Sequence, residues 1–156
     1  SSDLEMNKAG ITVFEQGEGV SASALLRTFR NTEKAILLGT RSFWEGVDIQ
    51  GDALSVVVIT KLPFDVPSDP IIAARSESFE NSFGEYNLPE AILKFRQGFG
   101  RLIRSKTDRG LVVIMDSRIN TKSYGRNFIN SIPRCTRNSG SVRDIPRLAS
   151  IWMNRS

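Results

Sequence analysis

The stretch LSVVVIT, Leu54 to Thr60, is nearly continuously apolar, and every residue from Val56 onward is β-branched. Such residues are enriched in β-strands, where they pack well on a pleated surface. A strand with apolar side chains on both faces is typical of a parallel sheet that helices cover on both sides. We therefore expect a strand here in a buried sheet.

Three more short apolar runs rich in β-branched residues lie at Ile11 to Glu15, Ala35 to Thr40 and Leu111 to Asp116. Helical patterns alternate with these runs, and the alternation is typical of βαβ units around a parallel sheet. The sequence therefore predicts an α/β fold. We expect one domain over residues 1–156, in which residues 133–156 form either a tail or a docked C-terminal helix.

Helix-start signals accompany the helical patterns. Ser21 can cap one helix through its hydroxyl group, and Pro70 suits the first position of another. The predicted helices are Ser21 to Arg30, Asp69 to Phe83, Pro89 to Arg104 and Ser123 to Ile132.

The helix predicted from Pro89 to Arg104 has the clearest periodicity in the chain. Its apolar positions, including Phe95 and Phe99, fall within an arc of about 100°, whereas its polar positions lie on the opposite side. Those polar positions are Gln97, Arg101 and Arg104. One face of this helix should pack against the sheet, and the other is free to meet a partner.

Composition limits the kinds of site that the chain can form. The formal charge of +4 and the pI near 9.6 favour polyanionic partners such as nucleic acid or nucleotide phosphate. Histidine is absent and Cys135 is the only cysteine, which excludes Ser-His pairs, Cys-His pairs and a disulfide. A single thiol cannot hold a zinc ion or an iron-sulfur cluster, so we expect a reducing, cytoplasmic setting.

No apolar run approaches the ~20 residues that a membrane-spanning helix needs, so we expect no membrane partner. The chain begins with Ser1 and Ser2 rather than Met. We expect it to be a fragment of a longer polypeptide, although a processed end has the same appearance.

The segment LLGTRSFWEGVDIQGD, Leu37 to Asp52, is a candidate binding loop after a predicted strand. Thr40 and Ser42 can donate hydrogen bonds to phosphate at the carboxyl end of that strand. Alternatively, the segment is a turn that needs glycine, with the two hydroxyl groups capping a short helix. Two of its carboxylates, Glu45 and Asp48, are either an acid-base or metal-binding pair, or caps and arginine partners.

The segment FRQGFGRLIRS, Phe95 to Ser105, contains two glycines inside a predicted helix. Gly98 and Gly100 each cost on the order of 1 kcal/mol relative to alanine, which is understandable if a partner approaches the backbone closely. Arg101 and Arg104 can chelate phosphate oxygens and stabilise charge on a transferring phosphoryl group. The alternative is an ordinary solvated basic face.

Four elements in order resemble a known family. QGFGRLIR matches the QxxGRxxR pattern of motif VI of superfamily-two helicases, and SFWEGVD, Ser42 to Asp48, resembles motif V as written in the DinG and XPD family. LPF, Leu62 to Phe64, followed by two prolines, resembles the family's segment after the strand, and MDSR, Met115 to Arg118, resembles its late D-x-R element. The likeness covers roughly residues 37–132.

The resemblance implies a RecA-like, three-layer α/β domain with a mostly parallel sheet, the second motor half of an ATP-dependent 5′ to 3′ DNA helicase in DNA repair. ATP would lie between the two motor halves and single-stranded DNA across both. The resemblance assigns the site residues as follows: Gln97 with the arginine fingers Arg101 and Arg104 to catalysis; Gly46, Asp48 and Gly100 to ATP; Thr40, Arg41, Ser42 and Trp44 to DNA. Trp44 is equally well explained as a core residue.

Several parts of such a motor are missing from the sequence. No Gly-Lys dipeptide and no Asp-Glu-Ala-His box occurs, so the P-loop and the magnesium site would belong to the N-terminal motor domain of the same polypeptide. An iron-sulfur cluster would also belong to that half. Because the P-loop is absent, we expect the chain alone to be inactive. The strand expected ahead of Ile11 is not visible, so we expect the sheet to lack its first strand.

Two alternatives remain open from the sequence. The chain is compatible with a non-catalytic nucleic-acid-binding or regulatory module that keeps the same fold. It is also compatible with an exonuclease-fused or RNA-acting relative. Sequence containing a P-loop upstream would favour the motor, and a preference for RNA would exclude the DNA assignment.

Overall fold

The computed structural model describes residues 6, 8–17, 19–39, 54–66, 68–102 and 110–154. The chain forms two compact units, residues 1–53 and residues 54–156, and each is described here by itself. Within the described ranges, no helix combines the length and the apolar content needed to cross a bilayer. The expectation of one domain stays a prediction.

The first unit is a βαβ unit. Strand β1 (Thr12–Glu15) and strand β2 (Ala35–Leu38) are parallel, with Thr12 opposite Ala35, and helix α2 (Ala22–Arg30) connects them. Ser21 caps α2 as predicted, because its hydroxyl oxygen accepts a hydrogen bond from the backbone N–H of Ala24 at 3.2 Å. The buried side of α2 consists of Leu25, Leu26 and Phe29.

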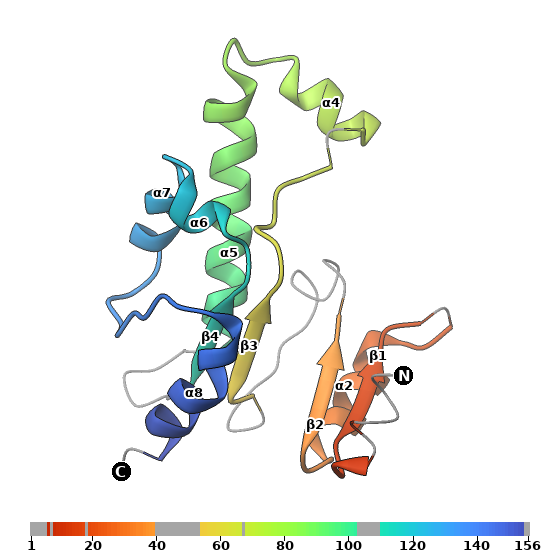
Figure 1. Cartoon of the computed structure of the whole chain (residues 1–156). Helices are drawn as coiled ribbons and strands as arrows, with labels where there is room; N and C mark the ends of the chain where they lie inside the picture. The colour runs from red at the N-terminus through yellow and green to blue at the C-terminus, as the bar shows by residue number, and fades with distance from the viewer. Residues whose placement is uncertain are drawn as a thin grey trace. The chain divides into compact units, whose positions relative to one another are not determined.

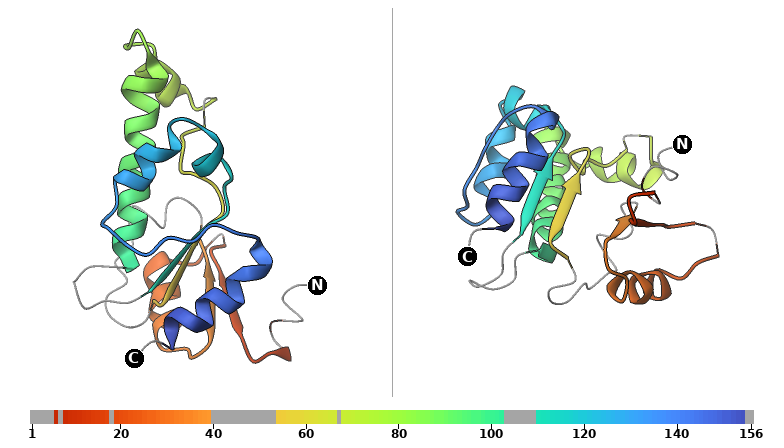
Figure 2. Two further views of the ribbon diagram at one scale, coloured as in Figure 1. Left: turned by 60° about the vertical axis from the view of Figure 1, so that its left-hand side comes forward. Right: turned by 60° about the horizontal axis from the view of Figure 1, so that its bottom comes forward.

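The second unit is built on another parallel strand pair, β3 (Val56–Ile59) and β4 (Leu111–Ile114), with Val56 opposite Leu111. Helix α5 (Leu88–Leu102) contacts both strands, and its C-terminal half runs beside them (Figure 1). In both further views the strand pair lies between α5 and α8 (Ile145–Met153) (Figure 2). The prediction of an α/β fold with parallel strands is confirmed.

Strand β3 is covered less completely than its sequence predicts. Ile59 is only 1% exposed, whereas Val56 and Val58, which alternate with it, are 40% and 52% exposed. Successive side chains on a strand point to opposite faces, so the face shared by Val56 and Val58 is the open one. An apolar run indicates that both faces of a strand favour burial. It does not indicate which face of the sheet another helix or strand covers.

The helix predicted over Asp69 to Phe83 is shorter in the structure. Helix α4 (Pro70–Ser76) is followed by turns and then by the π-helical segment η2 (Phe83–Asn87), which continues into α5. The side-chain oxygen of Asn81 accepts a hydrogen bond from the backbone N–H of Gly84 at 3.1 Å. Polar side chains that bond to nearby backbone in this way compete with helix formation, which explains the early end of α4.

The helix predicted over Ser123 to Ile132 is present with shorter bounds, and a further short helix that the sequence did not predict precedes it. These helices are α6 (Arg118–Thr121) and α7 (Gly125–Asn130), and they pack together. A Cβ atom at Gly125 would overlap the carbonyl group of Ile119, so only glycine fits this close approach. The short 3-10 helix η3 (Val142–Asp144) precedes α8.

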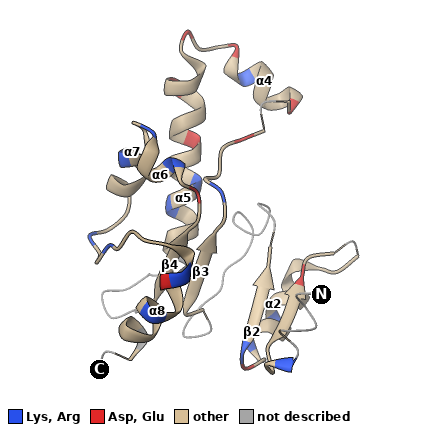
Figure 3. Cartoon of the chain, in the orientation of Figure 1, with Lys and Arg blue, Asp and Glu red and all other residues tan. Residues whose placement is uncertain are grey.

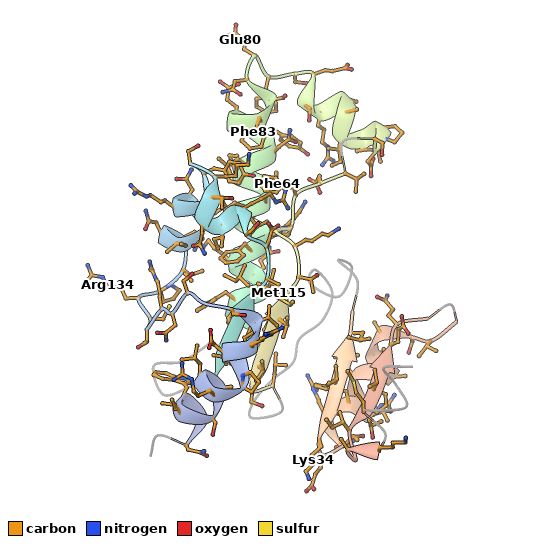
Figure 4. The ribbon with its side chains drawn as sticks, viewed as in Figure 1. Lys34, Phe64, Glu80, Phe83, Met115 and Arg134 are labelled. Atoms are coloured by element: carbon orange, nitrogen blue, oxygen red, sulfur yellow. The ribbon has the colours of Figure 1, made fainter. Side chains whose placement is uncertain are left out.

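The core of the second unit is an aromatic cluster between α5, α7 and the segment after β3. Phe95 and Phe128 are fully buried, with ring centroids 5.4 Å apart in an edge-on arrangement. Phe64 reaches this cluster from the segment after β3, and its ring lies 5.7 Å from Phe128 and 5.9 Å from Phe83 (Figure 4). Edge-on and offset ring pairs add to the stabilisation that burial provides.

Candidate functional site

Helix α5 presents two of the predicted site residues on its exposed face. Gln97 and Gly100 are exposed, whereas Phe95 and Phe99 are buried at 0% and 7%. The amphipathic arrangement predicted for this helix is therefore confirmed over its described residues. Position 101 belongs to the same helix and follows Gln97 by about one turn.

The two glycines of α5 differ in their surroundings. Gly98 lies on the buried side, whereas Gly100 is exposed and a Cβ atom added there would meet nothing within 4 Å. The described part of the chain therefore does not require glycine at position 100. The sequence predicted close approach of a partner at both glycines; the position of Gly98 on the buried side does not fit this, and for Gly100 it stays a prediction.

Other predicted site residues lie outside the described residues. They are Thr40, Arg41, Ser42, Trp44, Gly46, Asp48 and Arg104. Their roles stay predictions that rest on the motif resemblance.

A carboxylate at the carboxyl end of the strand pair joins two segments that are distant in sequence. Asp116, just after β4, accepts a hydrogen bond from the backbone N–H of Leu62, just after β3, at 2.8 Å. The same carboxylate accepts from Arg118, through its backbone N–H at 3.0 Å and through its guanidinium group at 2.6 Å and 2.9 Å. The segments LPF and DSR, which the sequence showed only as separate motifs, thus form one junction.

The electrostatics of this junction favour the ionised carboxylate. Hydrogen bonding from Arg118 lowers the pKa of Asp116 from 3.8 to about 2, with smaller contributions from the backbone N–H groups and against the opposing effect of burial. The same pair raises the pKa of Arg118. The Asp116 side chain is 8% exposed and that of Arg118 is 39% exposed, so water reaches the arginine side of the pair and screens part of the interaction.

Arg118 also extends the junction into the aromatic cluster. Its guanidinium carbon lies 5.4 Å from the centroid of the Phe64 ring, a cation–π arrangement. The Phe64 ring in turn lies 5.5 Å from the Tyr124 ring on the approach to α7. The sequence carried a signal for this contact, since Phe64 and Arg118 belong to two of the four motifs, but nothing in their spacing indicated that they meet.

A buried ion pair anchors α5 one turn before Gln97. The ammonium group of Lys94 lies 2.7 Å and 2.9 Å from the two carboxylate oxygens of Asp65, and the side chains are 12% and 2% exposed. Asp65 follows Phe64 directly, so this ion pair ties the helix to the same segment that Asp116 holds. Sequence analysis did not identify this pair, because charged residues 29 positions apart give no local pattern.

The described residues contain no group of three or more His, Cys, Asp or Glu side chains that could hold a metal ion. Cys135 is exposed and has a free thiol. What the described residues offer to a ligand on α5 is the amide group of Gln97 and the open surface at Gly100, on a helix whose other face is buried. Such a surface suits phosphate oxygens.

Comparison with known families agrees with this geometry. The sequence model of the family described as "Helicase C-terminal domain" matches residues 2–135, which is most of the chain. The chain belongs to this family of helicase C-terminal domains. The matched range includes Gln97, Gly100 and the Asp116–Arg118 junction, so the structural features above are features of a helicase C-terminal domain.

Individual relatives confirm the resemblance to the DinG and XPD family. The 3'-5' exonuclease DinG of Bacillus subtilis is 47% identical over 133 residues, which cover 82% of this chain and 14% of the relative. The ATP-dependent DNA helicase YoaA is 41% identical over 152 residues in Haemophilus influenzae, covering 95% of this chain and 23% of the relative. The YoaA helicase of Escherichia coli is 45% identical over 141 residues, covering 88% and 21%. This helicase C-terminal domain therefore spans less than a quarter of the length of these relatives.

Proposed function

We propose that the chain is the second motor half of an ATP-dependent DNA helicase, and that the exposed face of α5 turns toward the nucleotide. The observation that carries the proposal is the combination of exposed Gln97 and open Gly100 on one helix. The helix is fixed by buried Phe95 and Phe99 and by the ion pair of Lys94 with Asp65. Family membership supports it, as do two relatives that are named ATP-dependent DNA helicases.

The donors in this face fit a nucleotide phosphate. When bound, ATP supplies the phosphoryl group that is transferred to water. Gln97 donates hydrogen bonds through its amide group, and Arg101 and Arg104 act as arginine fingers that stabilise negative charge as it develops. Gly100 has no side chain, so nothing beyond its backbone stands between that part of α5 and the phosphate oxygens.

The segment after β2 supplies the contact to DNA in this proposal. Thr40, Arg41 and Ser42 donate hydrogen bonds to phosphates of the single strand, and Trp44 shapes the loop or stacks on a base. Gly46 and Asp48 lie near the nucleotide and couple hydrolysis to movement. These roles rest on the resemblance to motif V.

The remaining machinery lies in the N-terminal motor domain of the same polypeptide, which holds the P-loop and Mg2+. We further propose 5′ to 3′ polarity and a role in DNA repair, in line with the family. Closure of the two halves on ATP brings the α5 face to the γ-phosphate, and hydrolysis releases the grip on DNA. The chain alone is then inactive toward ATP.

The test is a chimera in which the chain replaces the matched segment of the E. coli YoaA helicase, with which it is 45% identical. We expect ATP hydrolysis that single-stranded DNA stimulates, together with strand separation. The chain alone serves as the control and should not hydrolyse ATP. A folded chimera that binds DNA but neither hydrolyses ATP nor separates strands would favour the non-catalytic module instead.

A further inference from the structure

The C-terminal part of the second unit carries a strong positive charge. Between Ser117 and Asn154 there are seven basic residues and one acidic residue, a net charge of +6 in a chain whose total is +4. Six of these basic residues have exposed side chains, and we call them the basic strip: Lys122, Arg126, Arg134, Arg137, Arg143 and Arg147. The seventh, Arg118, is paired with Asp116.

No carboxylate within the described residues neutralises the basic strip. None of its six side chains forms an ion pair there, and the one acidic residue nearby, Asp144, has a structural role. The carboxylate of Asp144 accepts a hydrogen bond from the backbone N–H of Ser141 at 3.0 Å, as part of a capping box at η3. The positive charge of the strip is therefore available to a partner.

Contacts between distant segments bring four members of the strip together, whereas the other two, Arg143 and Arg147, lie on η3 and α8. The side-chain amide of Asn120, in α6, donates to the hydroxyl oxygen of Ser139 at 3.3 Å. The guanidinium group of Arg137 donates to the backbone carbonyl of Ile129, in α7, at 3.4 Å. The extended segment that carries Arg134 and Arg137 thus lies along the α6–α7 pair, which carries Lys122 and Arg126. Figure 3 shows basic residues on α6, α7, the following segment and α8.

Acidic residues gather in a different part of the same unit. From Ser68 to Glu90 there are five acidic residues and one basic residue, Arg75. Figure 4 places Glu80 at the outer end of the helical arm formed by α4 and the start of α5, and Arg134 on the segment after α7, far from that end. A polyanion would be repelled by this arm and attracted to the strip.

The strip offers charge but no exposed ring for base stacking. Among the described residues from Ser117 to Asn154, the aromatic side chains are Tyr124, Phe128 and Trp152, and none of them is exposed. Exposed arginine and lysine side chains bind phosphate groups whatever the base sequence, and no exposed ring among these described residues adds stacking on the bases. The ligand should therefore bind through its backbone, independently of sequence.

We propose that the basic strip binds the phosphodiester backbone of nucleic acid, as a second contact surface in addition to the segment after β2. Arg137, Arg143 and Arg147 lie beyond residue 135, where the match to the helicase C-terminal domain family ends. Binding of nucleic acid to the strip would not require ATP hydrolysis. The inference therefore goes beyond the proposed motor role.

The experiment measures equilibrium binding of the protein, without ATP, to a labelled oligothymidylate and to a labelled DNA duplex over a series of salt concentrations. Each phosphate contact contributes about 0.7 to the slope of log K against log salt for a single strand and about 0.9 for a duplex. In the variant Arg134→Gln/Arg143→Gln/Arg147→Gln, the magnitude of the slope should fall by about 2 for the single strand or about 3 for the duplex. The DNA whose salt slope falls in this variant, single strand or duplex, is the ligand of the strip.

Two further variants make the result specific. Lys122→Gln/Arg126→Gln should reduce the slope by roughly 1.4 to 1.8, since it removes two contacts from the same strip. Arg75→Gln makes the same chemical change on the acidic arm and should leave the slope unchanged. All substituted side chains are exposed, so thermal midpoints should stay close to that of the unmodified protein. Unchanged slopes in both strip variants, or no binding of either DNA at low salt, would overturn the proposal.

Discussion

Asp116 is the residue at which the segments after β3 and β4 meet. Its carboxylate accepts hydrogen bonds from Leu62 and Arg118, and its pKa of about 2 lies below the usual 3.8. A lowered pKa means that the folded state favours the ionised form. The corresponding stability is fully present above about pH 3.8 and is lost as the pH falls toward 2.

Substitution Asp116→Asn should lower the free energy of unfolding at neutral pH by about 2 kcal/mol, the equivalent of the pKa shift. Urea unfolding measured from pH 7 to pH 2 checks this value. Between pH 4 and pH 2, the free energy of unfolding of the unmodified protein should fall by about 2 kcal/mol more than that of Asp116→Asn. The control is Asp69→Asn, because asparagine also caps a helix and should keep the bond to the N–H of Ile71. Parallel pH curves for the protein and Asp116→Asn would contradict the assigned role.

Two glycines should respond in opposite ways to alanine. Gly125→Ala places a methyl group against the Ile119 carbonyl group and should destabilise the protein by about 1–3 kcal/mol.

Gly100→Ala places a methyl group in open space and should stabilise α5 by roughly 0.5–1 kcal/mol. The same methyl group should reduce ATP turnover of the chimera, because it blocks close approach of phosphate. Thermal unfolding and ATP hydrolysis separate the two effects. Full turnover in Gly100→Ala would remove this glycine from the nucleotide site.

Helix α5 is the element on which the proposed site depends, and its position is set by the core and by Lys94. A buried carboxylate that loses its cation is costly, so Lys94→Met should lower the free energy of unfolding by roughly 3 kcal/mol. The same change at exposed Lys61, Lys61→Met, should have little effect. Denaturant unfolding of both variants checks the difference. Equal stability of the two would mean that the ion pair does not anchor the helix.

At the level of elements, the sequence predicted best where the local pattern and the packing agree. Helix α2 was predicted from its cap at Ser21, and α5 from an apolar stripe whose period matches a helix. Helix α4 was predicted too long, because Pro70 marks where a helix starts but not where it ends, and Asn81 bonds to nearby backbone in the turn that follows. The exposure of Val58 could not be predicted, since it depends on which element covers that face of β3.

In the candidate site, too, local patterns were predictable from the sequence and long-range contacts were not. The donors of α5 lie in one short motif, so a sequence pattern could identify Gln97 and Gly100 and assign them to an exposed face. The junction between Asp116 and Leu62 joins residues 54 positions apart, and only the parallel pairing of β3 with β4 brings them together. Long-range contacts of this kind have no local sequence pattern. The sequence therefore revealed the two motifs but not the contact between them.

For the whole molecule, the central claim is that this chain stabilises the reacting phosphoryl group from the second motor half. The measurement is the comparison of Arg104→Ala with the unmodified chain in the YoaA chimera, following both ATP turnover and binding of single-stranded DNA. The account predicts that turnover is abolished while DNA binding changes little, because the arginine acts on charge that develops during the reaction. An unchanged turnover number in Arg104→Ala would contradict the account.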